Sequence, residues 1–409
     1  MEEPNHRIDS YLLKRYAAGQ CTEEEEAFID SWYITHKRSS SVHDIPQQQL
    51  EHDLATVWNH LEAHIQEERP TTSWKKWVSA AAAVLILGAS TYLYWSSANQ
   101  PTSVTHSDTV YEPVDIDQAH SVKYAKVDVA PAQSQAILVL SNGEKVHINK
   151  NMSRNSRTDH AVGIDLSRSD QIVYQPKQSE TGSIQVLTNT LIVPKGSVYT
   201  IILADGTKVS LNADSKLVFP IQFSGKKREV YLEGEAYFEV SKKSVTDGDI
   251  ALKQEFIVHA GPSSIQVLGT KFNVKAYKEE NTSSITLEEG AISLTTPRTS
   301  SPLVLKPGQR ATNHLNELVV EEIALHKELS WKNGDFYFEA ATIQDIMRQI
   351  SRWYNVEIQY LGETGQQQYI STISRTKTLK EVLEILETTT GLRFDIQQKG
   401  NERRVMVIP

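Results

Sequence analysis

One uncharged segment in an otherwise polar chain constrains the fold most strongly. Residues 77–95 read WVSAAAAVLILGASTYLYW and contain no charged side chain. As a helix rising about 1.5 Å per residue, this length reaches roughly 28 Å, close to the hydrocarbon core of a bilayer at about 30 Å. Tryptophan and tyrosine flank the apolar centre, as aromatic residues do at membrane interfaces. The segment therefore predicts one transmembrane helix over 77–95, although a buried helix of a soluble domain would give a similar pattern.

The charges beside this segment predict its orientation. Lys75 and Lys76 precede it, and no lysine or arginine follows until Lys123. Because positively charged flanks stay in the cytoplasm, residues 1–76 are expected there and residues 96–409 in the periplasm. A cleaved signal peptide is disfavoured, because a long patterned region precedes the segment. The sequence thus predicts a single-pass inner-membrane protein with a cytoplasmic N-terminus.

Composition excludes several kinds of site. The 409 residues carry a net charge of −9, so no broad basic surface suggests direct nucleic-acid binding. With Cys21 as the one cysteine, neither an intrachain disulfide nor a zinc site built on several thiolates can form. His60 and His64 have a helical spacing used by metal ligands, but no third ligand is recognisable. We therefore expect no metal and no cofactor.

Residues 1–76 show helical periodicity. Helices are predicted from Ile8 to Gly19, after a Thr22–Glu25 capping box, and over about 47–68. Three short amphipathic helices form too small a unit to bury every large apolar residue, so some are expected to contact a partner, although they can equally pack on one another. The candidate contact residues are Leu12, Leu13, Tyr16, Phe28, Trp32 and Trp58.

Beyond a polar linker at residues 96–121, the apolar period changes to two. AILVLSNGEKVHIN (136–149) and YTIILADGTKVSLN (199–212) repeat one pattern at an offset of 63 residues: a strand, an Asn-Gly or Asp-Gly turn, and a returning strand. Other short strands follow at regular spacing without long helices. Residues 122–322 are therefore predicted to form an all-β sandwich or jelly-roll-like domain.

The stretch REVYLEGEAYFEV (228–240) alternates clearly. Its polar face, predicted to point outward, consists of Tyr231, Glu233, Glu235, Tyr237 and Glu239. Carboxylates two residues apart on a strand stand about 7 Å apart, near the spacing that inverting glycosidases use. No second carboxylate from another strand can be nominated, however, so a solvated surface is the better interpretation and no enzymatic activity is expected.

Residues 331–409 are predicted to form a small α+β domain of two β-α-β units. Two helices are expected to begin at capping pairs, Thr342 with Asp345 and Thr378 with Glu381, and Gly391 is expected to end the second helix. The exposed sheet edges of such a small domain could bind a partner by strand addition.

A series of ordered motifs runs through residues 120–409. In chain order they are PKGSVYTIILADGTKVSLNADSKLVFP, REVYLEGEAYFEV, IQVLGTKFNVKAY, LEEGAISL, LKPGQRA and WKNGDFYF. This series resembles the FecR family, the membrane-spanning anti-sigma regulators of envelope signalling. The tail resembles the domain appended to many of these regulators, which is itself similar to the N-terminal domain of secretins and TonB-dependent receptors.

The resemblance implies a relay. An outer-membrane TonB-dependent transporter would engage the periplasmic domains, and the cytoplasmic helices would release or activate an extracytoplasmic-function (ECF) sigma factor. Residues 1–76 carry 14 acidic and 8 basic side chains, so this unit could cover a basic, nucleic-acid-facing surface of such a factor.

Two further hypotheses remain open. Some members of the family cleave themselves at a Gly-Thr bond, and Gly269-Thr270 is the matching pair, although a glycine required by strand geometry before an ordinary strand threonine is the simpler explanation. An alternative function is a membrane-tethered periplasmic carbohydrate- or cell-wall-binding module, suggested by the jelly-roll-like strands and by Tyr231 and Tyr237.

Overall fold

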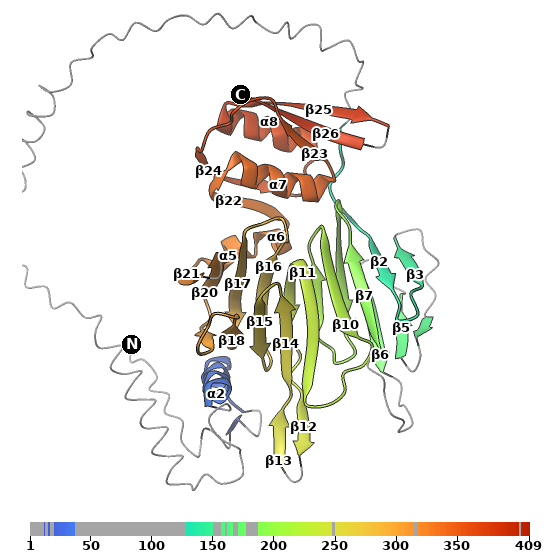
Figure 1. The fold of residues 1–409 in the computed structure, drawn as a ribbon, viewed down its shortest axis with the longest axis vertical. Helices are drawn as coiled ribbons and strands as arrows, with labels where there is room; N and C mark the ends of the chain where they lie inside the picture. The colour runs from blue at the N-terminus through green and yellow to red at the C-terminus, as the bar shows by residue number, and fades with distance from the viewer. Residues whose placement is uncertain are drawn as a thin grey trace, which may run out of the picture. The chain divides into compact units, whose positions relative to one another are not determined.

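The computed structural model describes a short N-terminal part of the chain and most of its C-terminal two thirds (Figure 1). The described residues are 12, 15–16, 20–36, 128–149, 157–159, 162–166, 171–176, 187–247, 250–314, 317–400 and 402–409. The predicted span 77–95, the linker 96–121 and the helix over about 47–68 lie outside them. Within the described ranges, no helix combines the length and apolar character needed to cross a membrane.

The β domain is a sandwich of two sheets that share one long strand, β11 (Lys227–Glu239). The first sheet has the spatial order β3 (Lys145–Ile148), β2 (Ala136–Val139), β7 (Thr188–Val193), β10 (Ser215–Pro220), β11, β14 (Glu255–Ala260), β15 (Ser263–Val267), β18 (Ile292–Thr295) and β19 (Leu303–Leu305). The second has the order β4 (Arg157–Asp159), β5 (Val162–Asp165), β6 (Gln171–Pro176), β8 (Ser197–Ile202), β9 (Lys208–Leu211), β11, β16 (Lys271–Ala276), β17 (Thr282–Glu289), β20 (Gln309–His314) and β21 (Glu317–Glu322). The prediction that this part of the chain is all-β is confirmed.

Gly234 is where β11 passes from one sheet to the other. Up to Leu232 the strand pairs with β14 of the first sheet, and from Gly234 onward it pairs with β16 of the second. Gly234 has φ +101°, and a Cβ atom there would lie 2.4 Å from Ser215 Oγ. The left-handed backbone and the close neighbour both require glycine. One core results, to which Leu217 of the first sheet and Phe272 of the second both contribute.

The two predicted hairpins of the internal repeat are confirmed. β2 pairs antiparallel with β3, and β8 pairs antiparallel with β9. Gly143 and Gly206 occupy equivalent turn positions, each with φ +86°, so the glycine of each Asn-Gly or Asp-Gly pair adopts the left-handed conformation. Small additional elements are β1 (Gln133–Ser134), which pairs parallel with β8, and a separate hairpin of β12 (Ser244–Asp247) and β13 (Ile250–Lys253).

The C-terminal domain contains the predicted helices and strands. Its elements are β22 (Asp335–Thr342), α7 (Ile343–Tyr354), β23 (Glu357–Tyr360), β24 (Gln368–Ser374), α8 (Leu379–Thr390), β25 (Arg393–Lys399) and β26 (Glu402–Ile408). Both predicted capping boxes are present, and Gly391 ends α8 in the left-handed conformation. The strands form a β22–β24 pair and a β23–β26–β25 sheet, so within each β-α-β unit the two strands belong to different sheets.

Two short helices, α5 (Leu325–Glu328) and α6 (Ser330–Asn333), connect the two domains. Near the N-terminus, α2 (Glu23–His36) begins at the predicted capping box, in which the Thr22 backbone N–H donates to Glu25 Oε2 at 2.8 Å and the Glu25 N–H donates to Thr22 Oγ1 at 3.3 Å. Local sequence signals therefore place the starts of α2, α7 and α8 correctly, whereas α5 and α6 have no side-chain cap and were not predicted.

Candidate functional site

Glu235 on β11 is a buried carboxylate. The prediction of an outward, solvated polar face is wrong for Glu235 and Tyr237, which are only 8% and 1% exposed. The second half of β11 is covered on this side, because Lys332 of α6 lies over the Tyr237 ring with Nζ 3.6 Å from the centroid. Burial is the larger cause that raises the pKa of Tyr237, and the neighbouring Glu288 carboxylate raises it further. The Tyr237 hydroxyl donates a hydrogen bond to that carboxylate. A carboxylate as enclosed as Glu235 needs protein partners.

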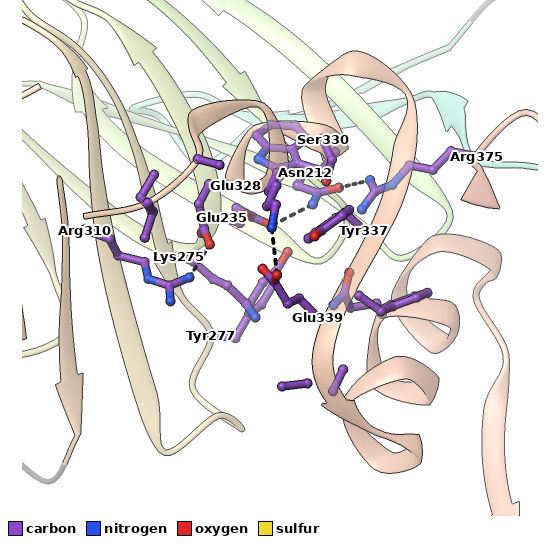
Figure 2. A pocket seen from close by; sticks show the side chains of 18 of the residues that line it. Asn212, Glu235, Lys275, Tyr277, Arg310, Glu328, Ser330, Tyr337, Glu339 and Arg375 are labelled. Carbon is purple, nitrogen blue, oxygen red and sulfur yellow. Dashed lines mark hydrogen bonds and ion pairs between the residues drawn. The ribbon is translucent and has the colours of Figure 1, made fainter. Parts of the chain in front are cut away.

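Two side-chain amides hold both oxygens of Glu235. Asn212, directly after β9, donates from Nδ2 to Oε2 at 2.7 Å, and Asn273 of β16 donates from Nδ2 to Oε1 at 3.1 Å. Arg375 Nη1 in turn donates to Asn212 Oδ1 at 3.2 Å. Trp331 Nε1 donates to Asn273 Oδ1 at 3.1 Å. Figure 2 shows Asn212 between Glu235 and Arg375, so the network joins the β domain to the connector and to the C-terminal domain.

Arg375 is a buried cation in this network. It is 5% exposed, and its guanidinium carbon lies 4.6 Å from the ring centroids of both Phe336 and Trp353. Its Nε is buried and has no hydrogen-bond partner. Burial lowers the pKa of Arg375 to about 10, and the negative charge of Glu235 opposes this shift. Glu235 and Arg375 thus have opposite charges separated by the amide of Asn212.

Arg352 of α7 makes a second connection between the domains. Its Nη1 donates to Glu279 at 2.9 Å and its Nη2 donates to Glu280 at 2.7 Å, while the guanidinium carbon lies 3.9 Å from the Tyr277 ring centroid. Lys275 Nζ lies 2.8 Å from Glu280 as well. Burial acts to raise the pKa of Glu280, but the positive charges of Lys275 and Arg352 outweigh it and leave the pKa below its ordinary value.

A cavity of about 580 Å³ lies beside these contacts and is lined by both domains (Figure 2). Trp331, Tyr337 and Trp353 give it aromatic walls. Its charged lining includes Glu235, Lys275, Arg310, Glu328, Glu339, Arg352 and Arg375. No group of acidic, histidine or cysteine side chains suited to a metal ion is found among the described residues, and His60 and His64 lie outside them. The cavity is therefore a polar interdomain site.

Asp128 and Val129 bind the C-terminal domain although they precede the β domain in the chain. Asp128 accepts a hydrogen bond from the backbone N–H of Lys380 at 3.0 Å, in the first turn of α8. The Val129 carbonyl accepts from the Leu379 N–H at 2.9 Å, and the Val129 side chain is 3% exposed within the core of that domain. The chain that follows residues 77–95 thus meets the C-terminal domain before it enters the sandwich.

The predicted partner-contact residues are partly described. Leu12 is buried, and Tyr16, Phe28 and Trp32 are half-buried. Leu13 and Trp58 lie outside the described residues. Half-buried aromatic side chains are compatible with a partner surface and with internal packing alike, so sigma-factor contact at these positions stays a prediction.

Helix α2 also contacts the β domain in this structure. Lys253 Nζ lies 2.9 Å from Asp30 Oδ1 and 3.6 Å from the centroid of the Tyr16 ring. Burial raises the pKa of Asp30, against the charge of Lys253. The predicted topology puts residues 1–76 and 96–409 on opposite sides of a membrane, and it excludes this contact once the chain is inserted. The two arrangements are alternatives.

Gly269 and Thr270 both have packing roles. A Cβ atom on Gly269 would lie 2.2 Å from Lys242 Cγ, so the position needs glycine unless that side chain moves. Thr270 is 2% exposed, and its hydroxyl donates to the Ala291 carbonyl at 3.1 Å. These contacts explain the pair without cleavage, and self-cleavage at this bond stays a prediction.

The fold and the site define a multidomain, β-rich protein with a polar contact between two domains. Comparison with protein families gives two matches: residues 189–293 match the FecR protein family, and residues 335–405 match the FecR C-terminal family. The first segment lies in the sandwich and the second in the C-terminal domain. Residues 189–293 and 335–405 are thus FecR-type segments, as the motifs indicated.

Two crystal structures of a candidate anti-sigma factor from Parabacteroides distasonis ATCC 8503 are similar to this chain. They are 26% and 27% identical to it, cover 53% and 54% of it and 97% and 99% of their own chains, and have a TM-score of 0.47 in both cases. No curated protein matches the chain.

Proposed function

We propose that this protein is a single-pass inner-membrane regulator. It relays a signal from an outer-membrane TonB-dependent transporter to a cytoplasmic ECF sigma factor and so controls transcription. The observation that carries the proposal is the occurrence of both FecR segments in order, after the predicted span 77–95. The relay needs no enzymatic step, no cofactor and no direct contact with nucleic acid.

The C-terminal domain offers a surface for the transporter. Among the described residues, β24 pairs with β22 alone, and Ile370 on β24 is 71% exposed. Leu361, which follows β23, is 52% exposed. A strand with an unpaired edge and an exposed apolar side chain can accept a partner strand, which supports docking by strand addition at β24.

The contacts of Asp128 and Val129 support a route for the signal. They tie the C-terminal domain to the chain that leads back to residues 77–95. A single helix transmits little by bending, so release or proteolysis of the tethered segment is a more defensible output than a gradual conformational change.

Affinity purification of the full-length chain from its native membranes tests the proposal. Mass spectrometry should identify an ECF sigma factor and a TonB-dependent transporter among the bound proteins. Phe28→Asp should lose the sigma factor and keep the transporter, whereas Ile370→Asp should do the reverse. Because each variant keeps one of the two partners, that retained partner shows that the unaltered part of the protein is still folded. Failure to recover any sigma factor, with transcription unchanged after deletion of the gene, would reject the proposal.

A carbohydrate-binding module is the second candidate. One observation favours it: Tyr231 is 53% exposed and stacks on His259, with ring centroids 4.8 Å apart and planes at 21°. Tyr237 is buried and offers no such surface. Saturable glycan binding that Tyr231→Ala abolishes, together with unchanged transcription on gene deletion, would favour this function over the relay.

A further inference from the structure

The cavity between the two domains contains one buried charge of each sign that lacks an ionic partner. Arg375 has no carboxylate, and Glu235 has no cation, within ion-pair distance among the described residues. A buried charge is costly unless it is paired. Here Arg375 has one neutral hydrogen bond, to Asn212, and Glu235 has two, from Asn212 and Asn273, so both charges are held by amides and not by an opposite charge. Both side chains line the cavity, so a ligand there can reach them.

The other buried or half-buried charges around the cavity are already neutralised by protein partners. Arg352 binds two carboxylates, and Lys275 shares one of them. Arg310 pairs with Glu328, and Lys327 pairs with Glu339. Arg375 and Glu235 take part in no ion pair among the described residues. These two side chains therefore determine which ligands the cavity can bind.

These two charges together select the kind of ligand. A simple anion would be attracted by Arg375 but repelled by Glu235. A simple cation would be attracted by Glu235 but repelled by Arg375. A zwitterion with separate charged ends can satisfy both. The volume of about 580 Å³ falls within the range of roughly 300–1,000 Å³ that small-molecule sites occupy. The walls of Trp331, Tyr337 and Trp353 suit apolar side chains or peptide groups.

We propose that this cavity binds a short peptide with free ends, its carboxylate on Arg375 and its ammonium group on Glu235. The bound peptide bridges β11 and the loop after β24, and it fastens the C-terminal domain to the sandwich. This site goes beyond the relay proposed above, because it gives the regulator a periplasmic ligand of its own.

Equilibrium dialysis of the full-length chain in detergent against a randomised tripeptide library tests the proposal. Mass spectrometry should find a subset of peptides enriched on the protein side. The same library with acetylated N-termini or amidated C-termini should be enriched at least tenfold less. Equal enrichment of free and blocked peptides, or no enrichment of free ones, overturns the proposal, and this comparison needs no variant.

Two variants sharpen the assignment of the two ends. Glu235→Gln removes the negative charge but keeps the shape, so acetylated peptides should bind it as well as free ones do. Arg375→Met should bind neither the free nor the acetylated library. Amidated peptides, which lack the carboxylate, should bind Arg375→Met and the native chain equally weakly. Because the assay contains no sigma factor or transporter, a negative result leaves the relay standing, and failure of the relay leaves peptide binding untouched.

Discussion

At the scale of single residues, Asn212 connects two buried charges that do not touch. Its Oδ1 accepts from Arg375 Nη1 and from the Ala213 N–H, while its Nδ2 donates to Glu235. An amide can do this because it carries an acceptor and a donor on one planar group. A carboxylate would lack the donor and an ammonium group would lack the acceptor.

Asn212→Ala should destabilise the protein by about 3 kcal/mol, because it leaves one oxygen of the buried Glu235 and one donor of Arg375 without a partner. Urea unfolding of the purified chain measures the change. The exposed Asn281→Ala serves as the control and should stay within about 0.5 kcal/mol of the unmodified protein. A loss below about 1 kcal/mol for Asn212→Ala would mean that the network is not a stabilising connection.

Glu280 gives the interdomain contact a pH dependence. Its pKa in the folded protein lies below the ordinary value, so its contribution to stability is complete above about pH 5 and is lost as the pH falls through the folded pKa. The melting temperature should therefore fall more steeply between pH 5 and pH 3, as rough bounds, than it does in Glu280→Gln. The exposed Glu402→Gln should keep the native slope. Parallel slopes for all three proteins would contradict this.

At the scale of elements, β11 requires glycine at position 234, both because of its backbone conformation there and because neighbouring atoms leave no room for a Cβ atom. Gly234→Ala should cost more than about 3 kcal/mol, because φ is +101° and the new Cβ would lie 2.7 Å from Ser215 Cα. Gly143→Ala is the matched control: φ is +86°, but nothing lies within 4 Å, so about 1 kcal/mol is expected. Denaturant unfolding compares the two. Equal losses would show that crowding at the sheet crossover is unimportant.

The contact between Asp128 and α8 should protect the preceding segment. Asp128→Ala removes the acceptor of the Lys380 N–H, so limited proteolysis of the full-length chain should cut between residues 96 and 130 several-fold faster. Glu384→Ala, an exposed change on the same helix, should leave the rate unchanged. If both variants are cut at the native rate, Asp128 does not hold this segment.

At the scale of the whole molecule, the proposed membrane topology and the packing of α2 on the β domain exclude each other. We expect a reporter fused at position 60 to be active only in the cytoplasm and one fused at position 200 only in the periplasm. Cysteines replacing Asp30 and Lys253, which lie 2.9 Å apart at their polar atoms, should then not cross-link in native membranes. Efficient cross-linking, or both reporters active in one compartment, would show that the helix and the sandwich share a compartment.

The sequence by itself determined those features that depend on residues within a turn or a hairpin of each other. The capping boxes of Thr342 and Thr378, the end of α8 at Gly391 and the repeated hairpins are local, so their physics can be recognised in a short window. The period of two along residues 228–240 also separates the polar positions from the apolar ones that lie in the core, which are Val230, Leu232, Ala236, Phe238 and Val240. The FecR motifs could also be recognised from the sequence alone, because each is a contiguous stretch of residues.

Only the tertiary structure decided which polar residues are buried and what they touch. Glu235 is paired with Asn212 across 23 residues, Arg375 reaches Asn212 across 163, and Asp128 meets Lys380 across 252. Strand alternation predicts two faces but cannot tell whether a polar face meets water or a second domain. The residues that bury such a polar face come from distant parts of the chain. Whether a buried charge is tolerated on that face depends on the hydrogen bonds that those distant residues supply.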